Sequence, residues 1–142
     1  MKRKLAMILL ISMTLSLLTA CAPATPSEVA ERYLSALKNN NAGAMADCLA
    51  PEAAKQLREL SALLGSTAKG QQLWSISPGL VPPPVGEGEV YHINIEITGE
   101  QIEEDTAWVS AEIEYVTDEQ EYMQELLLTL EQRGSRWYIS GG

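Results

Sequence analysis

The pattern of apolar and polar residues changes its period once along this 142-residue chain. Between residues 27 and 64, apolar side chains recur every three or four positions, the spacing of the buried face of a helix. Between residues 91 and 139, apolar and polar side chains alternate, the spacing of a strand with one buried face. Helices followed by an antiparallel meander of strands are typical of an α+β fold.

Three helices are expected in the first of these stretches. Thr25 is placed to cap the first helix, with Pro26 in its first position and Glu28 completing a capping box. Asn41 is placed to cap a short second helix, and Pro51 opens a third. The residues expected to face inward are Ala30, Tyr33, Leu34 and Leu37 in the first helix, Met45, Cys48 and Leu49 in the second, and Leu57, Leu60 and Leu64 in the third.

Four antiparallel strands are expected after Gly88, with a tight turn at Arg133-Gly134. No element is predicted for residues 66–88, which contain Trp74 and three consecutive prolines. The residues expected on the apolar face of the sheet are Tyr91, Ile93, Ile95, Ile97, Ala107, Val109, Ala111, Ile113, Tyr115, Leu126, Leu128 and Leu130. Trp137, Tyr138 and Ile139 form the last short strand.

The first twenty-one residues carry a separate signal. Lys2, Arg3 and Lys4 precede an apolar stretch that ends in Leu18-Thr19-Ala20-Cys21. This arrangement resembles the signal peptide and lipobox of a bacterial lipoprotein. The apolar stretch is shorter than the ~20 residues that span a bilayer, and it fits the ~7–15 residues of a cleaved signal. An ordinary secretory signal would not require a cysteine directly after Ala20.

The resemblance implies an address and a domain organisation. Residues 1–20 are the signal peptide, residues 21–26 a lipidated tether, and residues 27–142 a single α+β domain. Cys21 carries a covalent lipid, and no other cofactor is expected. The mature protein is then a membrane-associated lipoprotein, anchored by its lipid on the extracytoplasmic face of the cell membrane.

Charge and cysteine content restrict the mature chain further. Removing the three basic signal residues leaves seven of the ten Lys and Arg against nineteen Asp and Glu, a formal charge of −12. Such a chain is repelled by phosphate backbones, so no nucleic-acid partner is expected. With Cys21 acylated, Cys48 has no partner for a disulfide, and its position between Met45 and Leu49 favours a buried, unreactive thiol.

The predicted order of elements is similar to the cystatin-like, nuclear-transport-factor-two-like fold, in which N-terminal helices pack on a curved four-stranded antiparallel sheet. The matching stretches are residues 27–52, with Tyr33-Leu34 and an Asn-rich break, and residues 134–139. The resemblance implies a cone-shaped pocket between the helices and the sheet, where isomerases and dehydratases of the superfamily place Asp, His or Tyr. The candidate pocket residues are Tyr33, Trp74, Tyr91 and Tyr115, with Asp47 as a possible acid. Each has packing or solvent exposure as its alternative.

No catalytic or metal-binding residue is predicted. The one histidine, His92, alternates with Asn94 and Glu96 on the polar face of a strand, and no nucleophile elbow is present. The acidic run Glu100–Asp105 lacks the spacing of a calcium loop.

Two apolar side chains fall on the polar face of the predicted sheet. Trp108 and Leu127 lie there among acidic residues, and exposed aromatic residues mark binding patches. They suggest an interface with a second copy or another envelope protein. The alternative is burial of Trp108 under the loop around Trp74.

The sequence therefore favours an anchored protein whose domain binds a small ligand or a protein without catalysis. The alternatives are a pocket enzyme of the isomerase or dehydratase type and a cell-envelope scaffold protein.

Overall fold

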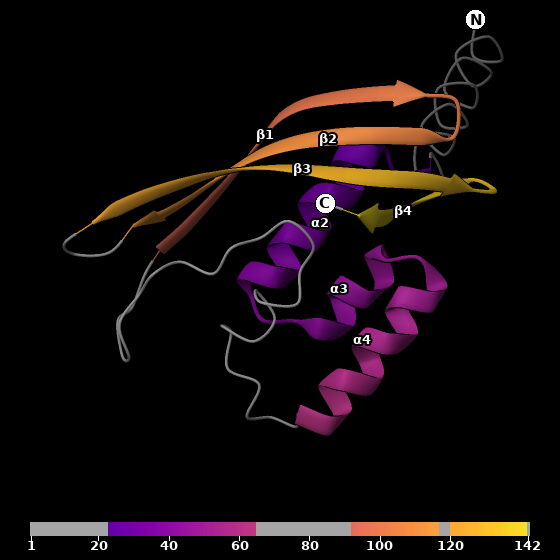
Figure 1. Ribbon diagram of the computed structural model, residues 1–142, viewed down its shortest axis with the longest axis horizontal. Coiled ribbons are helices and arrows are strands. Elements are labelled where there is room, and N and C mark those ends of the chain that lie inside the picture. Colours follow the sequence, from indigo (N-terminus) through magenta and orange to yellow (C-terminus); the bar gives the residue numbers. More distant parts are fainter. Residues whose placement is uncertain (1–22, 65–91, 117–119, 142) are drawn as a thin grey trace, which may run out of the picture.

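Three helices pack against one four-stranded antiparallel sheet in the computed structural model, which describes residues 23–64, 92–116 and 120–141 (Figure 1). The helices are α2 (Pro26–Lys38), α3 (Ala42–Cys48) and α4 (Pro51–Leu64). The strands are β1 (His92–Glu103), β2 (Thr106–Val116), β3 (Glu121–Arg133) and β4 (Arg136–Gly141). The predicted α+β class and order of elements are confirmed.

The first two helices begin directly after the capping residues that the sequence predicted. Thr25 Oγ1 accepts from the backbone N–H of Glu28 at 3.2 Å, and the Glu28 carboxylate accepts from the backbone N–H of Thr25 at 2.8 Å. Asn41 Oδ1 accepts from the backbone N–H of Ala44 at 3.0 Å. These side chains satisfy N–H groups that the first turn of a helix leaves without an intrahelical partner.

The four strands are ordered β1-β2-β3-β4, so each strand pairs with its neighbour in the sequence. Val109 lies opposite Leu128, and Ala111 lies opposite Leu126, which aligns the apolar faces of β2 and β3. A bulge between Ile97 and Gly99 shifts the register of β1. Residues after the bulge, such as the half-exposed Ile102, therefore do not continue the alternation of inward and outward side chains set by the first half of the strand.

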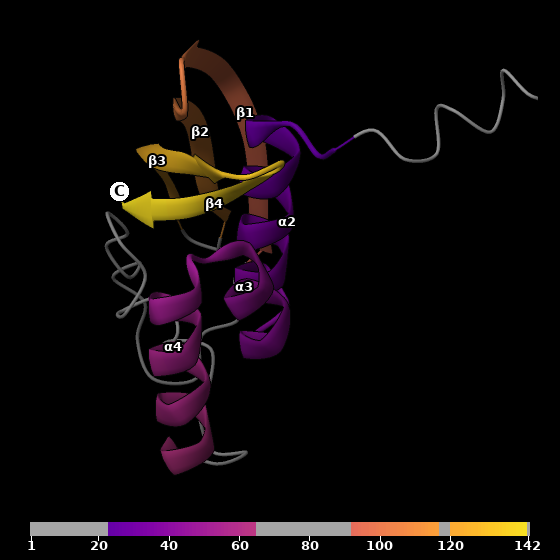
Figure 2. The same cartoon turned by 90° about the vertical axis from the view of Figure 1, so that its right-hand side faces the viewer.

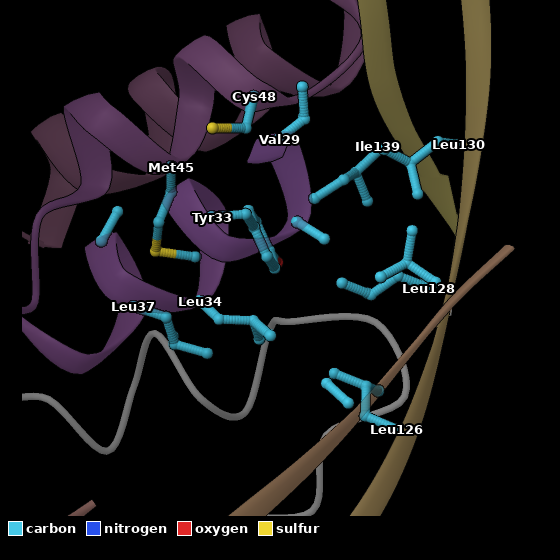
Figure 3. Packing of buried hydrophobic residues seen from close by; sticks show 14 of the residues in the cluster. Val29, Tyr33, Leu34, Leu37, Met45, Cys48, Leu126, Leu128, Leu130 and Ile139 are labelled. Carbon is cyan, nitrogen blue, oxygen red and sulfur yellow. The ribbon is translucent and has the colours of Figure 1, made fainter. Parts of the chain in front are cut away.

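The core lies between α2 and the inner faces of β2 and β3. Figure 3 shows Tyr33, Leu34 and Leu37 of α2 directed toward the sheet residues. The largest fully buried side chains are Tyr33, Tyr115, Leu34, Leu37, Met45, Ile113, Leu128, Leu130, Ile139, Val109 and Pro26. The predicted apolar faces of α2, α3, β2 and β3 are confirmed by this burial.

The prediction for the third helix is wrong at Leu60, which is 37% exposed. Only the first half of α4 contributes to the core, through Ala54 and Leu57. Figure 2 shows the reason: α4 runs beside α3 and away from the sheet. The apolar stripe of α4 therefore has no sheet surface to cover along its second half, where Leu63 is 84% exposed. The side chain of Leu64 lies outside the described residues.

The link between α3 and α4 lies along the outer edge of β4. Leu49 forms a parallel bridge with Ile139, and the backbone N–H of Ala50 donates to the carbonyl of Ile139 at 3.4 Å. Arg133, at the end of β3, donates to the Glu52 carboxylate at 3.0 Å. These contacts place the C-terminus of α3 and the start of α4 against β4.

Candidate functional site

Two of the four predicted pocket residues, Tyr33 and Tyr115, belong to the part of the chain that the structure describes. Tyr33 and Tyr115 are each 1% exposed and belong to the core between α2 and the sheet (Figure 3). Neither lines the groove or the smaller pocket described below. Trp74 and Tyr91 lie outside the described residues. A ligand-binding role for these four side chains stays a prediction.

A groove of about 870 Å³ lies elsewhere, between α2, α3, the first half of α4 and β4. Asp47, the predicted acid, lies on its wall and is exposed. The charged residues that line the groove are Glu31, Arg32, Asp47, Arg58 and Arg136. The described ranges contain six Lys and Arg residues, so half of these cations line one groove of a strongly acidic protein.

A second pocket of about 400 Å³ adjoins the groove where the chain enters α2. Pro23, Ala24 and Trp137 line only this smaller pocket. Arg32, Asp47, Cys48 and Arg136 line both. These four shared residues therefore form the boundary between the two hollows.

The three arginines of the groove differ in their partners. Arg58 Nη2 pairs with Asp47 Oδ1 at 2.7 Å. The Arg136 guanidinium lies 5.5 Å from the ring centre of Tyr138, a cation–π contact. Arg32 is exposed and makes no ion pair within the described ranges. Arg32 and Arg136 thus form no ion pair with a carboxylate of the described chain, although Glu31 and Asp47 line the same groove.

Cys48 lies at this boundary and is only 7% exposed, which confirms the prediction of a buried cysteine. Burial raises the pKa of its thiol above the ordinary value of 9.0, and Asp47 raises the pKa further, while Arg32 and Arg136 oppose both effects. The thiol donates to the carbonyl of Ala44 at 3.4 Å. A thiol that stays protonated at neutral pH is a weak nucleophile.

Little in the sequence pointed to this groove. Arg32 lies on the polar face of a helix, and Arg136 follows a tight turn, positions where a cation is ordinary. The two residues come together only because β4 packs beside α2 and α3. Cations are scarce in this acidic chain, but their small number does not indicate where in the fold they lie.

Trp108 and Leu127 lie on the sheet face opposite the core. Trp108 is half-buried, and Leu127 is 52% exposed. Leu127 lies opposite Ser110, and Trp108 lies opposite Thr129, so the two apolar side chains are diagonal neighbours on adjacent strands. Their role as an interface stays a prediction.

The remaining candidates give no site within the described ranges. His92 is exposed at the start of β1. No three His, Cys, Asp or Glu side chains of the described residues are arranged to hold a metal ion.

None of the described helices is long and apolar enough to cross a membrane. This finding concerns only the residues that the structure describes.

Comparison with known proteins gives one structural similarity. No protein-family model matches the sequence, and no curated protein matches it. The fold is similar to a crystal structure of a putative calcium/calmodulin-dependent protein kinase type II association domain from Thiobacillus denitrificans. The similarity has a TM-score of 0.49 at 8% sequence identity and covers 83% of this chain and 91% of that chain.

Proposed function

We propose that this protein is a lipid-anchored, extracytoplasmic binding protein of the bacterial envelope, whose groove between α2, α3, α4 and β4 holds a small polar ligand. The observation that carries the proposal is the gathering of three arginines on this groove in a chain with a large excess of acidic residues. Cations grouped in a concave surface attract and orient an anionic group.

The anchor is argued from the N-terminal sequence. The basic start, the short apolar stretch and Leu18-Thr19-Ala20-Cys21 together favour lipidation of Cys21. Pro23, two residues later, is already part of the wall of the smaller pocket. The tether is therefore short, and the domain stays close to the membrane surface.

Binding without catalysis is supported by the groups on the groove. Cys48, which lines the groove, is kept protonated by burial, which raises the pKa of its thiol. The carboxylate of Asp47 is engaged by Arg58 at 2.7 Å. The tyrosines Tyr33 and Tyr115 are enclosed by the core. These residues favour a site that holds a ligand over one that transforms it.

We also propose that the domain belongs to the cystatin-like, nuclear-transport-factor-two-like folds. The succession of helix, short helix, helix and a four-stranded antiparallel meander supports this assignment. In the described part of the chain, Tyr33, Met45 and Ile113 fill the space between α2 and the sheet. We therefore place the ligand in the groove outside that space.

Two measurements on the full chain purified from membranes test the proposal. Intact mass reports acylation of Cys21, and Cys21→Ser is expected to leave the membrane fraction or to stay unprocessed. Native mass spectrometry in a neutral detergent reports a retained ligand. Ser35→Trp fills the larger groove, because Ser35 lies on its α2 wall, and is expected to remove that ligand. The matched control Gln56→Trp changes an exposed residue that lines neither hollow.

The outcomes are separable. A normally processed, membrane-retained Cys21→Ser chain contradicts the anchor. An adduct that persists in Ser35→Trp as in Gln56→Trp contradicts the groove.

A second candidate function is favoured by the outer sheet face. The 52% exposed Leu127 places apolar surface diagonally beside the half-buried Trp108. Such a patch suits a homodimer or an envelope partner. Light scattering on Trp108→Glu and Leu127→Glu tests this role. A dimer that both substitutions dissociate supports it, and a mass unchanged from that of the original protein argues against it.

A further inference from the structure

We propose that the smaller pocket binds the phosphate of an anionic phospholipid headgroup in the membrane that carries the protein. The inference rests on the proposed anchor at Cys21 and names a ligand for the pocket beside it. Its support comes from the location of the pocket, its cations and its tryptophan.

The pocket lies where the lipid would hold it against the membrane. Pro23 and Ala24 form part of its wall, and Pro23 is two residues from Cys21. Two extended residues span at most about 7 Å. The polar headgroup region of each leaflet is roughly 5–8 Å thick, half the difference between total and hydrocarbon thickness. A pocket wall this close to an acylated cysteine is within reach of neighbouring headgroups.

Two cations of the pocket are available for a phosphate. Arg32 comes from α2 and Arg136 from β4, and both line the pocket and are exposed. Neither is paired with a carboxylate in the described ranges. Asp47, the carboxylate of the same wall, is held by Arg58 at 2.7 Å. Arginine binds phosphate through paired N–H groups in fixed geometry, so two arginines can hold one phosphate from two sides.

Trp137 completes the pocket on the β4 side. Its side chain is half-buried and packs partly against the core. An indole that is apolar on one side and donates from its N–H on the other suits the membrane–water interface. The mature chain carries a formal charge of −12 and is repelled as a whole by anionic lipid. Two unpaired arginines beside the anchor oppose this repulsion at the point of attachment.

Soluble headgroups test the pocket directly. The full chain, purified from membranes in a neutral detergent, is titrated by calorimetry with glycerophosphoglycerol, glycerophosphocholine and inorganic phosphate. We expect saturable binding of glycerophosphoglycerol, weakened at least about tenfold in Arg32→Gln/Arg136→Gln, because charge-assisted hydrogen bonds to phosphate are lost. The control Lys38→Gln/Lys55→Gln removes the same charge outside both hollows and is expected to change affinity less than about twofold.

A lipid measurement follows on the same proteins. The chain is placed in nanodiscs of phosphatidylcholine alone or mixed equally with phosphatidylglycerol. A ligand bound only by the folded state raises the unfolding temperature. We expect phosphatidylglycerol to raise it for the original chain and the lysine control, and to have no such effect on the arginine variant.

Three results would overturn the inference. They are no binding of glycerophosphoglycerol, equal weakening in the lysine control, and tighter binding of inorganic phosphate than of glycerophosphoglycerol, which would assign the pocket to free phosphate. Intact mass of the same sample separates this failure from failure of the anchor. If the chain is acylated but does not bind glycerophosphoglycerol, only the lipid site is refuted. If the chain is not acylated, the anchor is refuted.

Discussion

Glu100 holds the first turn of α2 against β1 through Ser27. Its carboxylate accepts from the Ser27 backbone N–H at 2.8 Å and from the Ser27 hydroxyl at 2.6 Å. The negative charge also lies at the N-terminus of the helix, where the helix dipole favours it. One side chain thus joins the start of α2 to the edge strand of the sheet.

The first prediction concerns this contact. Glu100→Ala should lower the free energy of unfolding by about 1 kcal/mol, because two hydrogen bonds to a charged but solvent-exposed acceptor are lost. Chemical denaturation at neutral pH measures the change. Glu103→Ala is the control, because among the described residues the Glu103 carboxylate accepts from Gln101 of the same strand, at 2.8 Å. Equal losses in the two variants would show that the contact with Ser27 contributes nothing specific.

The second prediction concerns the turn between β3 and β4. Gly134 has a φ of +64°, and a Cβ added there meets no atom within 4 Å. Gly134→Ala should therefore cost about 1 kcal/mol from backbone strain alone. Gly141→Ala also adds a Cβ to open space, but without a positive φ, and should leave stability unchanged or slightly higher. Thermal unfolding of both variants checks the difference, and a neutral Gly134→Ala would contradict the assigned turn.

The third prediction concerns acid. The pKa of Glu52 lies below its ordinary value of 4.5, because the carboxylate accepts hydrogen bonds from its own backbone N–H and from Arg133. A carboxyl with a depressed pKa stabilises the fold above the pKa it has in the unfolded chain. That contribution disappears as pH falls through the lower, folded-state value. Protonation should thus loosen the contact between α4 and β3.

Denaturation of Glu52→Gln at neutral pH and at about pH 3 measures this effect. The variant should lose less stability on acidification than the original chain, since residue 52 no longer titrates. Glu59→Gln, on the same helix, is the control, with its carboxylate 3.7 Å from Lys55. An identical pH dependence in Glu52→Gln and the original chain would refute the role of Glu52.

The fourth prediction compares two adjacent leucines of β3. Leu128 is fully buried and Leu127 is 52% exposed on the other face. Leu128→Ala should cost about 3 kcal/mol, because removing a buried leucine leaves a cavity, whereas Leu127→Ala should cost under about 1 kcal/mol. Denaturation of the monomer measures both. A large loss at Leu127 that depends on protein concentration would instead reveal an interface on the outer face.

The sequence predicted best what depends on neighbouring residues. The capping box of Thr25 and Glu28 and the alternation around Val109 are local, and the structure confirms both. Leu60 was predicted wrongly because the stripe of a helix shows which face is apolar but not how far its partner extends. The groove escaped prediction because Arg32 and Arg136 meet only through the packing of β4 against the helices. Contacts between residues so far apart in the sequence produce no periodic pattern of apolar and polar residues.

The link between α3 and α4 has a consequence for how copies of this protein can associate. Leu49 and Ala50 occupy the edge of β4 at Ile139, so a strand from another copy cannot pair with β4 at that residue. An uncovered edge strand is a template for pairing with another chain, and covering it hinders such pairing. The connection between α3 and α4 therefore both joins two helices and limits edge-to-edge association of copies at β4.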